Sequence, residues 1–432
     1  MRLTGLLKNK TVKNAGWIIG GRLANKALAF LVSILTARYL GPGNNGLIGY
    51  VTAYVTFFAS ICNLGINSVI IKDFVDNPEE EGEAIGTTLV LRAVSSALSA
   101  VMIIGIVWLM DRDPLTVLVA ALSSLGLIFQ VFDTLKKWFQ AKLQSKYVAI
   151  GTLVAYVVVS AYRLVLLAMG KSVSWFAMAT SVDYLAVAVF LLWAYRKKDG
   201  PRLSFSMKKA KQLLKMSSSY IIAGVMVSVY ASTDKLMLKQ MLDDASVGYY
   251  VTAVSLSTTW TFLLEAVVDS MYPSVIQSYN QDKALFEQRN RQLYAIVLYC
   301  ALFVSLVISL LARPLISVLY GEAYLPTVNP LRIICWYTAF SYLGVARNAW
   351  MVCENKQKYL KYLYIASAVL NVALNLLLIP YWGPSGAAVA SLVTQIFTTV
   401  CLPAMIPPLR PNAKLMVEAM FLKGMIKRKK LP

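Results

Sequence analysis

The sequence predicts an all-α integral membrane protein with about twelve transmembrane helices. Of its 432 residues, 58% are hydrophobic and 15% are charged, whereas an average soluble domain has about 25% charged residues. Apolar runs such as 85–110 and 291–312 reach the roughly 20 residues that a helix needs to cross the bilayer core. These runs lack the two-residue alternation of a membrane β-barrel, and backbone polar groups in lipid must be satisfied internally, so each run is expected to be a helix.

Twelve spans can be placed along the chain. The first half contains 12–39, 45–71, 84–110, 114–138, 146–169 and 174–195, and the second half contains 216–240, 246–272, 289–312, 326–350, 357–379 and 385–406. The basic flank and apolar run at the start resemble a signal peptide, but the apolar run continues past residue 35 without a convincing cleavage site. The first span is therefore predicted to be a retained helix.

Lys and Arg are distributed very unevenly among the segments that join these spans. Thirty of the 42 basic residues lie at the N-terminus, in every second connection and in the C-terminal tail, and the opposite side has only Arg112, Lys171, Lys239 and Arg313. Because basic loops stay cytoplasmic, both termini are predicted to be cytoplasmic and the number of helices even. The formal charge of +21 is expected to meet anionic membrane lipids, and no nucleic-acid partner is expected because no soluble stretch gathers the basic residues on one face.

A strongly basic segment at 196–215 separates two halves of similar length. It predicts an N-terminal six-helix bundle at 1–195, a cytoplasmic linker, a C-terminal six-helix bundle at 216–406 and a basic cytoplasmic tail at 407–432. Short strings recur in the two halves: GYVTA at 49–53 resembles YYVTA at 249–253, and Trp138 with Lys146-Tyr147 has the same spacing as Trp350 with Lys358-Tyr359. The repeats predict a duplicated unit with a pseudo-two-fold axis along the membrane normal.

Residues for covalent or metal-dependent chemistry are missing from the sequence. It has no histidine, and its five cysteines have no C-x-x-C spacing, so hydrolytic triads, zinc sites and a disulfide framework are not expected. The acidic pair of Asp111-Arg112-Asp113 has the spacing of a glycosyltransferase metal motif, but it lies in a short external turn with no catalytic domain attached. The chain is predicted to need no cofactor and not to be an enzyme.

Basic residues inside the predicted spans are the first candidate site residues. Placing a cation at mid-membrane costs at least about 3 kcal/mol, so such residues are expected to face a protein interior or a hydrated cavity. Arg22 and Lys26 are four residues apart and share one helical face. A cationic cavity would suit a pyrophosphate, although snorkelling or structural ion pairs are the alternative for those nearer the span ends. The proposed cavity cations are Arg22, Lys26, Arg92, Arg163, Lys235, Arg332 and Arg347.

Acidic residues inside the spans are candidates for ion coupling. A carboxylate that takes up H⁺ or Na⁺ in one conformation and releases it in another links a gradient to alternating access. The alternative is that these acids pair with nearby cations, Asp133 with the basic residues near Lys136 and Asp234 in the neighbourhood of Lys235. The candidates are Asp133, Asp183, Asp234, Glu265 and Asp269.

Two strings in the second half are the most distinctive, RPLISVLYGEAYLPTVNPLRI at 313–333 and LNVALNLLLIPYWGPSGAAVASLVTQI at 370–396. They resemble the polysaccharide transporters of the multidrug/oligosaccharidyl-lipid/polysaccharide exporter superfamily, especially the Wzx-type flippases of O-antigen and other lipid-linked oligosaccharides. The string ARYLGPGNNGLIGY at 37–50 and Thr233-Asp234-Lys235 extend the resemblance to most of the chain. The matching positions in the two long strings are Gly321, Tyr324, Asn371, Asn375, Pro380, Gly383, Gly386, Ala387 and Ala388.

The resemblance implies a MATE-like fold of two six-helix bundles around a cavity that opens alternately to each side. It also implies a substrate, an undecaprenyl-pyrophosphate-linked oligosaccharide, that is moved outward across the bacterial inner membrane for O-antigen, capsule or exopolysaccharide assembly. Polysaccharide polymerase machinery is a candidate partner. A multidrug or lipid II exporter of the same superfamily and a membrane glycosyltransferase or polymerase remain alternatives.

Overall fold

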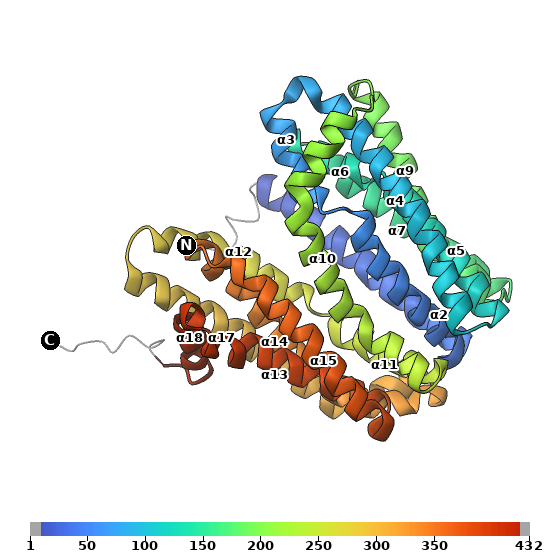
Figure 1. Ribbon diagram of the computed structural model, residues 1–432. Coiled ribbons are helices and arrows are strands. Elements are labelled where there is room, and N and C mark those ends of the chain that lie inside the picture. The colour runs from blue at the N-terminus through green and yellow to red at the C-terminus, as the bar shows by residue number, and fades with distance from the viewer. Residues whose placement is uncertain (1–9, 424–432) are drawn as a thin grey trace. The chain divides into compact units, whose positions relative to one another are not determined.

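The structure is a computed structural model that describes residues 10–423, with side chains described from residue 28 onward except at 219, 222 and 223. Within this range the chain is built of helices and short turns and has no β-strand. The helices group into two compact units (Figure 1). Unit 1 extends to Leu40 and includes Tyr54–Val225, and unit 2 comprises Gly41–Ala53 and the chain from Met226 onward.

Helix α2 contributes to both units because it is broken in the middle. It covers Lys10–Cys62, but Gly41 within it has φ 72° and ψ 171°, and Pro42 follows. A positive φ is accessible to glycine without steric cost, and proline has no N–H to continue the helical ladder. The break therefore separates two helical segments, as predicted for the connection between spans 12–39 and 45–71.

Unit 1 is built on four long helices that run side by side in Figure 1. They are α4 (Glu81–Met110), α5 (Pro114–Gln130), α7 (Ser145–Ala168) and α9 (Ala179–Lys197), joined by the shorter α3 (Ile70–Asp76), α6 (Asp133–Ala141) and α8 (Val173–Ala177). The first part of α10 (Met207–Met241) completes the unit. Its core lies near one end, where fully buried Ile85, Leu135 and Phe139 pack with Trp138.

Unit 2 contains the rest of α10 and the helices of the second half. These are α11 (Asp244–Thr258), α12 (Phe262–Tyr279), α13 (Lys283–Leu319), α14 (Val328–Cys353), α15 (Leu360–Trp382), α16 (Pro384–Ile396), α17 (Leu402–Met405) and α18 (Arg410–Met420). Helix α14 packs against α11, α13 and α16, and α15 packs against α16. The five residues Phe397–Cys401 form a π-helical turn between α16 and α17.

Each of the twelve predicted spans overlaps helix in the structure, although the span 45–71 runs past the end of α2 at Cys62 into a turn and α3. Among the described residues, eight single helices are long and apolar enough to cross a membrane, and the pair α11 and α12, bent by 42°, makes a ninth. One of the eight is α2, which holds two predicted spans on either side of Gly41. Helix α14, which contains Arg332 and Arg347, is not among them. The predicted all-α membrane fold is confirmed.

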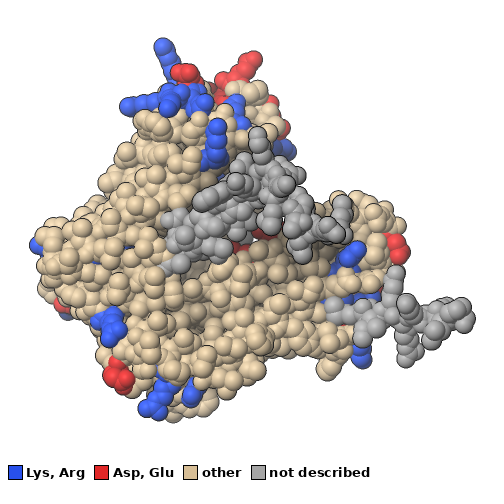
Figure 2. Space-filling model, turned by 180° about the vertical axis from the view of Figure 1, so that it is seen from behind, with Lys and Arg blue, Asp and Glu red and all other residues tan. Residues whose placement is uncertain are grey.

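The outward faces of the long helices are apolar. Exposed fractions are 69% for Val101 on α4, 68% for Phe303 and 70% for Leu310 on α13, and 63% for Leu377 on α15. Figure 2 shows one face, on which charged side chains gather in groups and broad stretches of surface are uncharged. Exposed apolar surface of this extent is unfavourable in water and is expected to contact lipid.

Two glycines allow α2 and α11 to touch within unit 2. A Cβ atom on Gly46 would lie 1.7 Å from the backbone oxygen of Asp244, and a Cβ atom on Gly248 would lie 2.0 Å from that of Pro42. The close approach lets Asn45 donate a hydrogen bond to Thr252 at 3.2 Å. Small residues commonly permit such contacts between membrane helices.

The substitution Gly248→Ala is expected to lower the stability of the protein by about 1–3 kcal/mol, because the methyl group meets backbone atoms that cannot rotate away. The measurement is thermal unfolding of the detergent-solubilised protein. Gly105→Ala is the matched control, since a Cβ atom there would have no neighbour within 4 Å. An equal melting temperature for both variants would contradict the proposed packing.

The basic linker is bound to unit 1 along part of its length. The Ser204 N–H donates to the Gly82 carbonyl at 3.3 Å, the Ser206 N–H donates to the Thr87 hydroxyl at 3.0 Å, and the Tyr195 hydroxyl donates to the Pro201 carbonyl. Farther along, the Lys209 ammonium group contacts Asp73 at 2.9 Å and Glu80 at 2.8 Å. The boundaries at 195 and 216 between the two predicted bundles and the linker stay a prediction. Helix α10 belongs to unit 1 up to Val225 and to unit 2 from Met226 onward.

Candidate functional site

Asp234 lies at the centre of a buried polar cluster in unit 2. It belongs to α10 and is 6% exposed. Its carboxylate accepts hydrogen bonds from the Tyr250 hydroxyl on α11, the Ser391 hydroxyl on α16 and, at 2.6 Å, the Asn375 amide on α15. Four helices therefore converge on one negative charge. Three donors compensate part of the desolvation cost of a buried carboxylate.

A second layer of polar groups supports this carboxylate. Asn371 and Asn375 lie one helical turn apart on the same face of α15, and both are fully buried. The Asn375 amide donates to the Asn371 carbonyl oxygen at 3.1 Å, and the Asn371 amide donates to Ser391 at 3.4 Å. The Asn375 carbonyl oxygen has no hydrogen-bond partner in the part of the chain that the structure describes. Asn residues at these positions are thus explained by a buried network.

The cluster is rich in oxygen atoms that suit a proton or a small hard cation. One carboxylate, two amide carbonyls and two hydroxyls lie within one hydrogen-bonded network. Oxygen ligands of this kind bind hard cations, and rotating an amide by half a turn presents its carbonyl where its N–H had been. No group of three or more His, Cys, Asp or Glu side chains that could hold a metal occurs among the described residues, so the cluster does not have the composition of a multi-carboxylate divalent site.

The other four predicted acids have different surroundings. Asp133 forms an ion pair with Lys136 at 2.7 Å, which is the pairing that the sequence offered as the alternative. Asp183 is half-buried on α9 and interacts electrostatically with Arg163 on α7. Glu265 and Asp269 are exposed on α12, where Glu265 accepts a hydrogen bond from Tyr342 at 2.9 Å. Asp234 is thus the most deeply buried of the five candidates.

Arg92 is the most deeply buried of the described candidate cations. It is 2% exposed in unit 1, and its guanidinium group donates to Thr134 at 2.9 Å, to the Asn67 side chain at 2.8 Å and to the Asn63 carbonyl at 3.3 Å. In this conformation it ties α4 to α6 and to the turn after α2. Arg347, in unit 2, is 6% exposed and donates to the Thr398 carbonyl at 3.4 Å.

The remaining candidate cations are spread over the two units. Arg332 is exposed near the start of α14 and donates to the Ser309 carbonyl at 3.4 Å, a position that allows snorkelling. Arg163 and Lys235 are half-buried. The side chains of Arg22 and Lys26 lie outside the described part of the structure. That all seven line one passage stays a prediction.

The four residues that surround Asp234 in this cluster were not among the predicted site residues. Tyr250 lies in the YYVTA repeat and Ser391 lies in the string 370–396, so both belong to segments that the sequence made conspicuous. Asn371 and Asn375 stood out as family positions without an assigned role. The contacts with Asp234 span 141 and 157 residues for Asn375 and Ser391, and such distant pairings leave no local signal.

Comparisons with known proteins agree with this architecture. The sequence matches the family described as polysaccharide biosynthesis protein over residues 11–279. No curated protein matches the chain. Among solved structures, a multidrug resistance MATE family transporter of the MOP superfamily in an inward-facing conformation has 14% sequence identity and a TM-score of 0.74, over 91% of this chain and 95% of that chain.

Two further solved structures are similar over almost their full lengths. The lipid II flippase MurJ in an inward closed conformation has 13% identity and a TM-score of 0.72, over 94% of this chain and 91% of that chain. A MOP superfamily transporter from Pyrococcus furiosus has 14% identity and a TM-score of 0.64, over 93% and 94%. At such identities the likeness shows the fold, which is the predicted MATE-like fold. With the family match, it follows that the chain is an integral membrane member of the polysaccharide biosynthesis protein family.

Proposed function

We propose that the protein is a flippase that moves undecaprenyl-pyrophosphate-linked oligosaccharide units across the bacterial inner membrane, with both termini cytoplasmic and without covalent chemistry. The polysaccharide family and the MATE-like fold support a transporter of a lipid-linked saccharide. The observation that carries an ion-coupled mechanism is the Asp234 cluster, because a compensated carboxylate buried in a membrane helix is a functional group by default. The products would enter O-antigen, capsule or exopolysaccharide assembly, where polymerase machinery is a candidate partner.

The proposed coupling step is the exchange of hydrogen-bond donors for a cation at Asp234. Uptake of H⁺ neutralises the carboxylate, which then no longer requires all three hydrogen-bond donors. Binding of Na⁺ instead requires oxygen atoms of the cluster to face the ion where donor groups faced the carboxylate. Either event changes the interactions among α10, α11, α15 and α16. An ion can shift the balance between conformations only by as much as its affinity differs between them. Asn375, whose carbonyl oxygen accepts no hydrogen bond from the described residues, is expected to reorient.

The basic side chains are proposed to accompany the pyrophosphate. Two phosphates in a region of low dielectric need nearby positive charge at each stage of their passage. Lys26 and Arg332 are the two positions at which loss of charge is expected to reduce transport without loss of expression. Arg92 and Arg347 are buried in this conformation and could act only after their present hydrogen bonds are exchanged.

Rescue of a bacterial strain that lacks its own oligosaccharide-lipid flippase tests the proposed function. The wild-type protein is expected to restore surface polysaccharide and to shift the lipid-linked sugar from the inner to the outer leaflet, as measured by leaflet-specific labelling. Purified protein in proteoliposomes should show the same exchange and should respond to a pH or Na⁺ gradient. If the protein is expressed normally but restores no surface polysaccharide, whichever lipid-linked oligosaccharide the strain makes, the proposal is contradicted.

A lipid II or multidrug exporter is the second candidate, favoured by the likeness to MurJ and to MATE transporters. Complementation of a strain depleted of its lipid II flippase distinguishes the first of these from the oligosaccharide flippase. A membrane glycosyltransferase or polymerase is the candidate from another class. Formation of a new product from radiolabelled sugar-lipid by the purified protein would favour the enzyme, and leaflet exchange alone would favour the flippase.

A further inference from the structure

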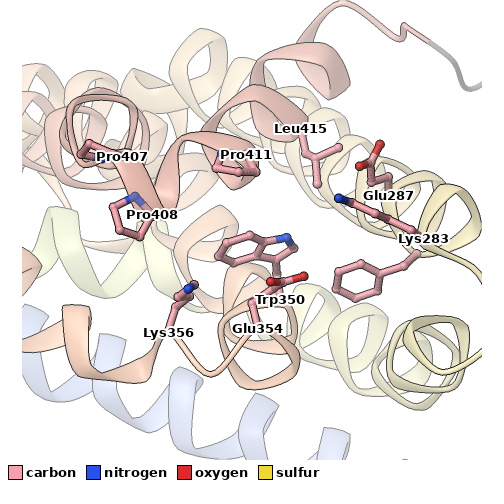
Figure 3. Close-up of a pocket in the computed structure, with 10 residues that line it drawn as sticks. Lys283, Glu287, Trp350, Glu354, Lys356, Pro407, Pro408, Pro411 and Leu415 are labelled. Carbon is pink, nitrogen blue, oxygen red and sulfur yellow. The ribbon is translucent and has the colours of Figure 1, made fainter.

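A charged pocket opens at one end of unit 2, away from the Asp234 cluster. It has a volume of about 210 Å³ and lies among the first turn of α13, the end of α14 and the segment that leads into α18 (Figure 3). Its charged lining consists of Lys283 and Glu287 from α13 and Glu354 and Lys356 from the end of α14. Trp350 and the prolines before and in α18 form its floor and wall.

The four charges around the pocket have no partners in the described part of the chain. Among the described residues, none of Lys283, Glu287, Glu354 and Lys356 forms an ion pair within 4 Å or a side-chain hydrogen bond. Trp350 is 3% exposed, and Figure 3 shows the nitrogen edge of its ring on the side where Lys283 and Glu287 lie. Within the described range this indole N–H also forms no hydrogen bond, so it can donate to a ligand in the pocket.

The walls of the pocket are held in place. Helix α18 is fixed on α13 by an ion pair between Arg291 and Glu418 at 2.6 Å and by a hydrogen bond from Asn412 to the Tyr294 hydroxyl at 2.7 Å. The Tyr299 hydroxyl donates to the Met420 carbonyl at 2.8 Å. The prolines of the wall precede and begin this helix. The pocket is therefore a preformed feature of the folded unit.

The corresponding place in unit 1 is closed by the chain's own charges. Trp138, which matches Trp350 in the sequence repeat, donates its indole N–H to Glu81 at the start of α4 at 3.0 Å. Lys142, four residues after Trp138, contacts the same carboxylate at 2.6 Å. In unit 2 the signs are exchanged: an acid, Glu354, follows Trp350 by four residues, and a lysine, Lys283, begins the helix that corresponds to α4. These two do not meet, and the space between them is the pocket.

From the predicted spans, the pocket is expected to lie at the level of the lipid headgroups. Its lining residues come just before the span 289–312 and just after the spans 326–350 and 385–406, which is the side predicted to be cytoplasmic. Its volume is below the roughly 300–1,000 Å³ of pockets for drug-sized ligands, so it suits a small polar group. Two positive and two negative side chains favour a ligand that itself carries one charge of each sign.

We propose that this pocket binds the phosphoethanolamine headgroup of a phosphatidylethanolamine lipid. The phosphate accepts hydrogen bonds from Lys283, Lys356 and the Trp350 indole, and the primary ammonium group donates to Glu287 and Glu354. Charge-assisted bonds of this kind are about twice as strong as neutral ones. A trimethylated choline headgroup has no N–H to donate, and a glycerol headgroup has no positive charge, so neither satisfies the two acids.

Lipid-dependent thermal stabilisation of the full-length protein in detergent tests the proposal. Phosphatidylethanolamine is expected to raise the melting temperature more than phosphatidylcholine or phosphatidylglycerol with the same acyl chains. The double variant Glu287→Gln and Glu354→Gln should lose this preference while keeping the wild-type melting temperature without lipid, because neither side chain has a partner among the described residues. The double variant Lys283→Gln and Lys356→Gln should reduce stabilisation by every phospholipid.

Lys414→Gln is the matched control, since Lys414 lies on α18 outside the pocket and its side chain is 77% exposed; it should retain the headgroup preference. Equal stabilisation by all three lipids, or an unchanged preference in the glutamate variant, would overturn the proposal. Inorganic phosphate and soluble phosphoethanolamine form a further arm. Stabilisation by either one as strong as that by the lipid would identify a site for a free solute and would overturn the assignment to a lipid.

Discussion

Replacing Asp234 by asparagine is expected to abolish gradient-driven transport while leaving a folded protein in the membrane. Asparagine keeps the shape of the side chain but cannot take up a proton or attract Na⁺, so the ion no longer distinguishes one conformation from another. The rate in proteoliposomes with a gradient should fall to the rate without one, by at least about tenfold, which corresponds to about 1.4 kcal/mol. The measurement is leaflet exchange of lipid-linked oligosaccharide with and without imposed pH and Na⁺ gradients.

Asp76→Asn is the matched control for this experiment, because Asp76 is an exposed acid at the end of α3, outside the predicted spans. Its transport is expected to retain the gradient response of the wild-type protein. The melting temperature of Asp234→Asn should be measured alongside, since the carboxylate contributes three hydrogen bonds to unit 2. A variant that is folded and responds fully to a gradient would remove Asp234 from the mechanism and leave the proposed flippase function to be judged by the rescue experiment.

The second large effect is expected on stability, from Lys209→Ala. Lys209 and Asp73 are 2% and 2% exposed in their side chains and meet at 2.9 Å. Removing one partner leaves a buried charge without compensation, which typically costs about 3–5 kcal/mol. Thermal unfolding in detergent should show a large drop in melting temperature. Lys211→Ala, an exposed change two residues away, should have little effect.

Removing both charges of this pair should be milder than removing one. The double variant Asp73→Leu and Lys209→Met leaves no buried charge at this position, and replacing a buried pair by apolar residues is often close to neutral. It is therefore expected to recover much of the stability that Lys209→Ala loses. A double variant as unstable as the sum of the two single variants would show that the residues do not act as a pair.

The contribution of this ion-paired group to stability depends on pH through Lys209 and Glu80, which both lie outside the predicted spans. Burial lowers the pKa of Lys209, but its hydrogen bonds to Glu80 and Asp73 outweigh burial and raise the pKa above its ordinary value. The hydrogen bond and charge of Lys209 lower the pKa of Glu80. The lysine therefore stabilises the fold at every pH below its ordinary pKa and loses this effect as pH rises through the raised value. Glu80 stabilises above its ordinary pKa and loses this effect as pH falls.

The helices could be predicted from the sequence because their signal is local. Apolar runs long enough to span a bilayer identify α4, α7 and α13 directly, and the pairing of Gly41 with Pro42 explains the break in α2. The segments that form α10 and α14 were also predicted, as spans 216–240 and 326–350.

The contacts between helices could not be predicted in this way. Asp234 was recognised as an acid in a span, but the sequence suggested the neighbourhood of Lys235 as its surroundings, and the structure instead places uncharged donors from three other helices around it. Lys209 belonged to a basic linker, yet it is buried because its acidic partners Asp73 and Glu80, 136 and 129 residues earlier, reach it. Contacts between residues so far apart in the sequence are determined by how the helices pack, which no local sequence pattern reports.

The break in α2 has a consequence for protein engineering. Residues 41–53 belong to the first half of the sequence but pack in unit 2, where Asn45 bonds to Thr252 and Gln240 donates to Tyr50 at 2.9 Å. A gene fragment that encodes only the second half of the sequence therefore lacks part of unit 2. A chimera of two relatives that is joined only in the basic linker will combine residues 41–53 of one protein with α10 and α11 of the other. A chimera that transfers 41–53 together with the second half will keep the native contacts between these segments.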